Sequence, residues 1–196
     1  MGKKKEKVLE IPTLEQIEAE LQKENHKHSF GRVMRSTTYT LLIVAAAAVL
    51  IAVMFLPVLQ ITGISMSETL WDGDIVVALS GSDYETGDVV AFYYNNNILV
   101  KRVIAVAGDW VDIDKDGNVY VNNELLEEPY VTEKSLGICD ITLPYQVPEE
   151  RIFVMGDHRD TSIDSRSSTI GSVSKEFLVG RILFRVWPLA DIGGIR

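Results

Sequence analysis

The sequence has very few of the residues that cross-link small proteins or bind metals. Cys139 is the one cysteine, so no disulfide can form within the chain, and the three histidines are His26, His28 and His158. No cysteine and histidine group has the spacing of a zinc site. We therefore expect no metal and no cofactor, and we interpret Cys139 as a small, buried or half-buried side chain.

Basic residues are also scarce. The chain has 19 lysines and arginines against 28 aspartates and glutamates, which gives a net charge of -9. A nucleic-acid-binding surface needs clustered positive charge to displace the counterions of the phosphates, so nucleic acid is not expected as a partner. A length of 196 residues allows one compact domain with an appendage.

Charge is missing altogether between Ser36 and Ser67, and residues 41–56 are almost wholly apolar. With its flanks, this stretch reaches the roughly 20 residues that cross a hydrocarbon core of ~30 Å. A buried core helix would show a polar face, and a cleavable signal peptide would have a shorter leader and a small-x-small site after the apolar run. The pattern predicts a single, permanent transmembrane helix over residues 37–59, in contact with membrane lipid.

The charges around this span predict its orientation in the cell membrane. Eight lysines and arginines precede the span, with Arg32 and Arg35 nearest to it, whereas the first charges that follow it are acidic. By the positive-inside rule, residues 1–36 are cytoplasmic and residues 60–196 are extracytoplasmic. Apolar residues at helical spacing predict a short helix within the cytoplasmic segment, over residues 13–25.

Beyond residue 70 the chain changes to short β-branched runs that are separated by turn residues. Such runs occur over residues 74–79, 88–94 and 98–107. Residues 110–114 and 118–121 flank Lys-Asp-Gly and predict a hairpin. The expected fold is mainly β: an antiparallel sheet domain with a small inserted β hairpin region over residues 108–150, preceded by the one N-terminal helix.

The predicted hairpin contains an acidic run that imitates a calcium loop. Asp112, Asp114 and Asp116 precede Gly117, as in the first half of an EF-hand. Position twelve of the loop is Asn123, however, where calcium needs a bidentate glutamate, and the flanks are strands. We therefore expect no calcium site.

Ser65 follows the predicted span closely and is a candidate nucleophile. A catalytic serine needs a base within hydrogen-bond reach. His26 and His28 lie across the expected membrane, and His158 lies in a polar, turn-rich run. Lys101 lies in an apolar strand, where burial would lower its pKa and favour the neutral amine. From the residues alone, a Ser-His pair, a Ser-Lys pair and a solvent-facing Lys101 on an edge strand all stay open.

Several short motifs follow the anchor in a fixed order. The motifs are Ser65-Met66-x-x-Thr69-Leu70, Gly73-Asp74, Lys101-Arg102-Val103-Ile104-Ala105 with Gly108-Asp109, and Gly156-Asp157-x-Arg159-Asp160-x-Ser162-x-Asp164-Ser165-Arg166 with Gly171. In this order they resemble the conserved boxes of the bacterial type I signal peptidases, peptidase family S26, and the resemblance extends from the anchor to near residue 186.

The resemblance implies a membrane-bound serine endopeptidase that removes signal peptides from exported preproteins after a small-x-small motif. It implies that Ser65 is the nucleophile, that Lys101 is the general base and that Ser162 orients the lysine amine. By the same resemblance, ion pairing in the last box fixes the loop. The residues of that box are Asp157, Asp164 and Arg166, and those implied to line the oxyanion and substrate site are Gly63, Ile61, Met66, Leu70, Leu99 and Val100.

The chain departs from the family pattern at two positions. Glu68 stands where many members have proline, three residues after the nucleophile. Gly63 stands where some members have a serine that donates to the oxyanion, and glycine there resembles the Gram-positive branch. The backbone N–H of Ser65 is then the one oxyanion donor that the sequence names.

The partners implied are preprotein signal peptides, and we expect a monomer that works near the secretion translocon. Two alternatives stay open: a Ser-Lys peptidase dedicated to one client, and a non-catalytic assembly factor built on the same sheet. A cytosolic self-cleaving repressor is excluded by the spanning segment.

Overall fold

The computed structural model describes residues 13–81 and 83–195, without the side chains of residues 24–30. The lysines at positions 3–7 and the side chains of His26 and His28 lie outside this part of the chain. Contacts within the chain define two units, Met1–Ile51 and Ala52–Arg196.

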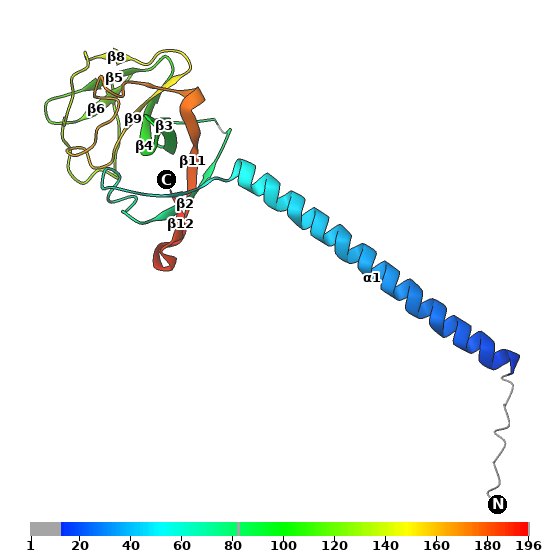
Figure 1. Ribbon diagram of the computed structural model, residues 1–196. Helices are drawn as coiled ribbons and strands as arrows, with labels where there is room; N and C mark the ends of the chain where they lie inside the picture. The colour runs from blue at the N-terminus through cyan, green and yellow to red at the C-terminus, as the bar shows by residue number, and fades with distance from the viewer. Residues whose placement is uncertain (1–12, 82, 196) are drawn as a thin grey trace, which may run out of the picture. The chain divides into compact units, whose positions relative to one another are not determined.

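The first unit is occupied by α1 (Leu14–Phe55), a continuous helix of 42 residues whose last turn belongs to the second unit (Figure 1). Two separate helices were expected here. The segment Gly31–Phe55 has 25 residues and a mean hydropathy of 2.4, and none of its most apolar window is buried. At ~1.5 Å per residue it is ~38 Å long, enough to cross a bilayer core of ~30 Å. The segment therefore has the length and the exposed apolar surface of a membrane anchor, and differs from a core helix.

The helix ends at Phe55, before the expected boundary at residue 59. Pro57 has no backbone N–H, so it cannot extend the helix, and the residues that follow it form a strand. The carbonyl groups of Phe55 and Pro57 accept hydrogen bonds from the amides of Ser80 and Ala78. These bonds fix the last turn of the helix to the sheet of the second unit.

The described residues of the second unit form two sheets in which every pairing is antiparallel, and the prediction of a mainly β fold is confirmed. In the larger sheet the strand order is β1-β2-β11-β3-β4-β9-β10, with β12 beside β11. Its strands are β1 (Val58–Gln60), β2 (Ile75–Leu79), β3 (Val89–Tyr94), β4 (Asn97–Val106), β9 (Arg151–Met155), β10 (Val173–Ser174), β11 (Leu178–Trp187) and β12 (Gly193–Gly194), with short 3-10 helices at Lys175–Phe177 and Leu189–Asp191.

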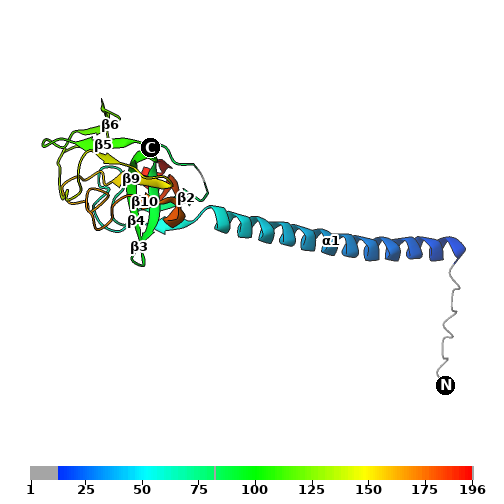
Figure 2. The same ribbon diagram turned by 90° about the horizontal axis from the view of Figure 1, so that it is seen from above.

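The smaller sheet lies at one edge of the second unit (Figure 2). Its order is β7-β6-β5-β8, and it falls within the expected insertion, between β4 and β9. The Asp114 carboxylate accepts hydrogen bonds from the amides of Asp116 and Asn118, so the acidic run closes the predicted hairpin. Cys139, in a loop of the same insertion, is half-buried, as expected. The strands are β5 (Trp110–Ile113), β6 (Val119–Val121), β7 (Glu124–Leu125) and β8 (Tyr145–Gln146).

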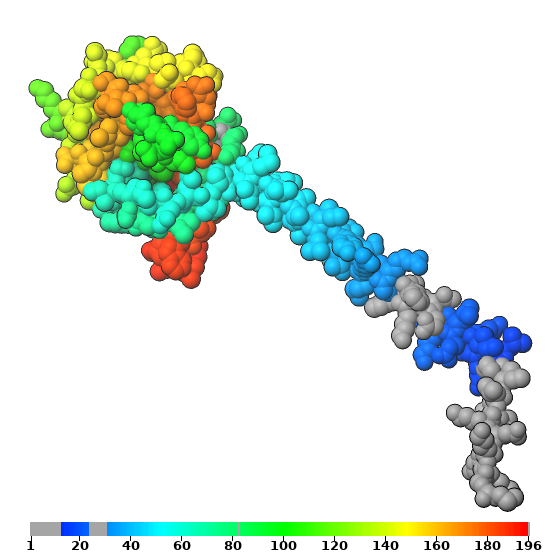
Figure 3. All heavy atoms as spheres, in the orientation of Figure 1, coloured from blue at the N-terminus to red at the C-terminus, as the bar shows by residue number. Residues whose placement is uncertain are grey.

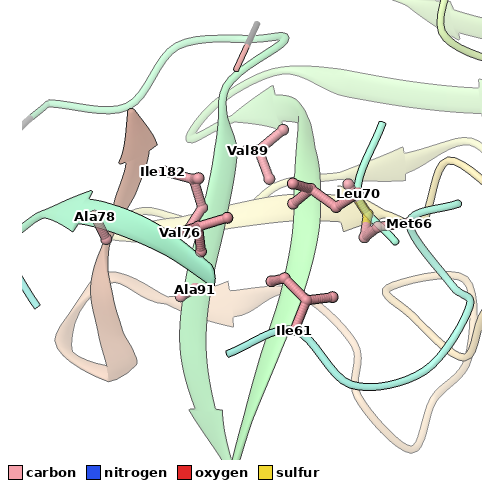
Figure 4. Packing of buried hydrophobic residues seen from close by; sticks show 8 residues of the cluster. All are labelled: Ile61, Met66, Leu70, Val76, Ala78, Val89, Ala91 and Ile182. Carbon is pink, nitrogen blue, oxygen red and sulfur yellow. The ribbon is translucent and has the colours of Figure 1, made fainter. Parts of the chain in front are cut away.

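A cluster of buried apolar side chains supports the loop that follows β1. Figure 4 shows Ile61, Met66 and Leu70 of this loop together with side chains from β2, β3 and β11. Burying a side chain of this size stabilises the folded state by about 1.5–3 kcal/mol. The loop that carries Ser65 is therefore held firmly against the sheet. The cluster consists of Ile61, Met66, Leu70, Val76, Ala78, Val89, Ala91 and Ile182.

Candidate active site

Ser65 lies in a tight turn between two anchored positions. Met66, the next residue, is 2% exposed and fills the core, while Ser65 itself is half-buried. Within the turn, the amide of Leu70 donates to the Met66 carbonyl over 2.8 Å. From the other side, the amide of His158 donates to the Ser65 carbonyl over 3.2 Å. The Met66 side chain and the Ser65 carbonyl are therefore both held in place.

Lys101 lies on β4 and its amine reaches the serine. The side chain is 3% exposed, and Nζ is hydrogen-bonded to Ser65 Oγ over 2.6 Å. The pKa of Lys101 is lowered to about 8, mainly by burial; the charge of Asp164 opposes this shift, that of Arg166 adds to it, and that of Asp157 opposes it. A large fraction of the amine is therefore neutral near pH 8, the form that can accept a proton.

Arg102, the next residue along β4, is also buried, on the opposite face of the strand. Successive side chains of a strand point to opposite faces, and here both faces are covered. Its guanidinium binds Asp157 through Nε and Nη2, over 2.9 and 2.7 Å, and donates to the Gly87 carbonyl over 2.7 Å. Thr69 joins the cluster by donating to Asp157 over 2.5 Å. Asp157 thus connects β4 with the turn of Ser65.

The loop between Gly156 and Arg166, called here the catalytic loop, contains a second buried ion pair. Asp164 and Arg166 are fully buried, with Arg166 Nε 2.9 Å from Asp164 Oδ1, and the Gly156 amide donates to Asp164 over 2.9 Å. Burial alone would raise the pKa of Asp164, but the hydrogen bond and charge of Arg166, with the Gly156 amide, hold it below its usual value. Asp164 therefore stays ionised at neutral pH.

Ser162 lies in the catalytic loop with its hydroxyl buried. Among the residues that the structure describes, Ser162 Oγ is one of two buried side-chain polar atoms that have no partner with hydrogen-bond geometry, although the hydroxyl is near enough to Asp164 to help lower the pKa of that carboxyl. A side chain at Gly156 would collide with this hydroxyl and with the Ser65 carbonyl. The close approach of these two serines across Gly156 therefore requires glycine.

A cleft of about 530 Å³ opens beside Ser65 and Lys101. One wall follows β1 and the other the first half of β4; Figure 3 shows these segments, turquoise and green, on the same face. In the described chain, β1 pairs with β2 alone, and residues 97–101 of β4 pair with β3 alone, so each wall presents a free strand edge. The lining consists of Val58, Leu59, Gln60, Ile61, Thr62, Gly63, Ser65, Met66, Asn96, Asn97, Ile98, Leu99, Val100 and Lys101.

One of the expected site residues is placed differently from the expectation. Leu70 was expected in the substrate pocket, but its side chain is 0% exposed and packs in the core, so it supports the cleft from below. The amide of Gly63 donates to Asp72 Oδ1 over 2.8 Å and is already engaged. The lining includes the remaining five predicted positions at the oxyanion and substrate site, Gly63 among them: Ile61, Gly63, Met66, Leu99 and Val100.

The histidine alternative finds no support in this arrangement. The His158 ring is hydrogen-bonded to Thr161 through Nδ1, over 3.0 Å, and it is the backbone amide of His158 that meets Ser65. Within residues 13–81 and 83–195, no group of three or more histidine, cysteine, aspartate or glutamate side chains is placed to hold a metal ion.

The sequence alone gave no role to three charged side chains that the structure buries: Arg102, Glu128 and Arg159. The sequence does contain a signal for Arg102, because it is a second cation, next to Lys101, in an otherwise apolar run. The sequence contains no such signal for Glu128, because it lies in a loop and its partner Arg159 is 31 residues away.

Comparison with known proteins gives a family match and several similar proteins. The sequence pattern of the family described as "Signal peptidase, peptidase S26" matches residues 34–187. The chain is 36% identical over 151 residues to signal peptidase IB of Staphylococcus aureus, covering 67% of this chain and 78% of that protein. It is 34% identical over 169 residues to the chloroplast thylakoidal processing peptidase 1 of Arabidopsis thaliana, covering 76% of this chain.

Coverage of these relatives is uneven. The chain spans 48% of the length of the Arabidopsis protein. A crystal structure of a signal peptidase I from Enterococcus faecalis aligns with a TM-score of 0.43 and 28% identity, over 51% of this chain and 97% of that one. The matched range, residues 34–187, nevertheless covers most of the chain and includes both Ser65 and Lys101. The chain belongs to the signal peptidase family, peptidase S26, and to its bacterial type I.

Proposed function

We propose that the chain is a membrane-anchored endopeptidase that removes signal peptides from exported preproteins by means of a Ser65-Lys101 dyad. The observation that carries the proposal is the 2.6 Å contact between Lys101 Nζ and Ser65 Oγ at a cleft with two free strand edges. A buried amine with a lowered pKa is a base suited to activating a serine.

The chemistry follows from this contact. Neutral Lys101 removes the hydroxyl proton as Ser65 Oγ attacks the substrate carbonyl, and the Ser65 amide stabilises the negative charge that develops on the carbonyl oxygen. The protonated amine then gives its proton to the leaving amine, which leaves an acyl-enzyme. Lys101, neutral again, activates a water molecule that hydrolyses the ester and restores the serine. The orphaned Ser162 hydroxyl is the group that we assign to orienting the amine.

The cleft favours an extended peptide with small side chains. The free edges of β1 and of residues 97–101 supply backbone donors and acceptors on both sides of a bound strand. Beneath it, Ile61 and Met66 are 5% and 2% exposed and form a shallow apolar floor. Large side chains that point to this floor would collide with it, so cleavage after a small-x-small motif is proposed.

The topology is part of the proposal. Arg32 and Arg35 lie at the N-terminal end of the apolar segment, which supports a cytoplasmic N-terminus. With this orientation, the unit Ala52–Arg196 is proposed to lie outside the cytoplasm, near the translocon from which preproteins emerge. Nucleophile, base and both cleft walls come from one chain, so a monomer is sufficient for activity.

Replacement of Ser65 by alanine tests the proposed function directly. We expect the full chain in detergent to cut a preprotein after its small-x-small motif and S65A to give no product, because alanine has no nucleophile. Mass spectrometry of the product identifies the bond that is cut. The control is S168A, which changes an exposed serine outside the cleft. Cleavage by S65A at the parental rate would refute the proposal.

The pH dependence of kcat/KM tests the base. Only the neutral amine accepts a proton, so activity should rise about tenfold per pH unit at acid pH and level off above a pKa of about 8. Preprotein cleavage measured between pH 5 and pH 10 gives the profile. A midpoint above pH 10, the value of an exposed lysine, would contradict a desolvated Lys101.

A further inference from the structure

The inserted region between β4 and β9 contributes a buried carboxylate to the catalytic loop. The side chains of Glu128 and Arg159 are both 0% exposed and form an ion pair, with a second contact of 3.1 Å between Arg159 Nη1 and Glu128 Oε2. Glu127, the preceding residue, is exposed. Of these two adjacent glutamates, Glu128 therefore binds the catalytic loop and Glu127 faces solvent.

Arg159 connects Glu128 to the backbone around the nucleophile. Arg159 Nε donates to the Gly156 carbonyl over 3.1 Å, and the Arg159 carbonyl accepts from Arg166 Nη2 over 2.8 Å. Between these positions is His158, whose amide donates to the Ser65 carbonyl. A shift of the Arg159 side chain therefore moves the turn that holds the backbone of Ser65.

Tyr130, two residues after Glu128, connects the insertion to β4. Its ring covers the guanidinium of Arg102, whose Cζ lies 3.9 Å from the ring centroid, and its hydroxyl donates to Glu128 Oε1 over 3.3 Å. Burial, and then the charge of Glu128, raise the pKa of Tyr130, so the hydroxyl stays protonated. Arg102 is covalently next to Lys101 and is enclosed by Tyr130 and Asp157.

We propose that Glu128 and Tyr130 are positioning residues: from the insertion they hold the His158 turn and the Arg102 guanidinium so that Ser65 and Lys101 keep their reactive distance. The inference rests on the proposed Ser65-Lys101 function. A buried ion pair adds little net stability over an apolar pair, but it restricts the geometry of the groups that it joins. Displacements of about 1 Å at a reacting centre can cost about 100-fold in rate.

Two adjacent glutamates give a matched pair of variants, E128Q and E127Q. Each exchanges one carboxylate for an amide of the same shape. We expect E128Q to lower kcat about tenfold with KM within about twofold of the parent, and E127Q to change neither. The assay is preprotein cleavage by the full chain in detergent, with rates normalised to the folded fraction from thermal melting. An E128Q with parental kcat per folded molecule would overturn the proposal.

Tyr130 gives a second, independent pair, Y130F and Y130L. Both lose the hydroxyl, but only phenylalanine keeps a ring face over Arg102. Y130F is expected to retain a kcat near the parental value, and Y130L to lose about tenfold at unchanged KM. Equal kcat values for the two variants would overturn the role of the ring. If S65A is inactive in the same assay while all four variants behave as the parent, positioning fails and the proposed function stands.

Discussion

Replacing Lys101 by methionine is expected to lower kcat for preprotein cleavage by about 10⁴-fold or more. Methionine has a similar length and no amine, so Ser65 loses the only base within reach of its hydroxyl in the described structure. Stability should not fall with activity, since the 3% exposed Lys101 carries a desolvation cost that methionine does not. Single-turnover cleavage and a thermal melt of the same preparation measure both effects.

The matched control for this variant is K115M. Lys115 is exposed at the turn between β5 and β6 and is not among the residues that line the cleft, so its replacement should leave kcat unchanged. A K101M enzyme that retained a tenth or more of the parental kcat, with K115M unaffected, would show that another group serves as the base.

Replacing Arg166 by methionine is expected to lower the free energy of unfolding by about 3–5 kcal/mol. The variant leaves the Asp164 carboxylate buried without its cation. The desolvation penalty of an unpaired buried carboxylate is much larger than the free energy that an exposed ion pair contributes. Arg166 also donates to the carbonyl groups of Leu136 and Arg159, over 2.8 Å each, so the catalytic loop and the insertion lose a shared donor. Urea denaturation of the full chain in detergent measures the change.

The control for this variant is K175M, which removes an exposed cation instead of a buried one. Lys175 lies 4.0 Å from Glu150, and the two side chains are 45% and 79% exposed. Exposed pairs of this kind contribute about 0–1 kcal/mol, so K175M should unfold at nearly the parental urea concentration. If R166M and K175M lowered the free energy of unfolding by similar amounts, burial of the Asp164-Arg166 pair would not increase its contribution to stability.

Local patterns were sufficient for the class of fold and failed at the bounds of the helix. The alternating runs and the Lys-Asp-Gly turn predicted strands that the structure contains, because neighbouring residues determine β propensity and turn geometry. The helix was predicted in two pieces, but α1 runs from Leu14 to Phe55. Gly31 is the only helix breaker between the two predicted helices, and a single glycine costs about 1 kcal/mol, which a long helix tolerates.

The sequence by itself determined the apolar span, the antiparallel class, the hairpin and, through its family motifs, the two residues proposed for catalysis. Tertiary structure alone decided that Lys101 meets Ser65, that Arg102 is buried on the opposite face, that Leu70 supports the cleft from below and that Glu128 reaches Arg159. The reason is physical: period-two alternation separates the two faces of β4 but does not say which is covered. Contacts between residues 31 or 36 positions apart depend on how strands and loops pack together.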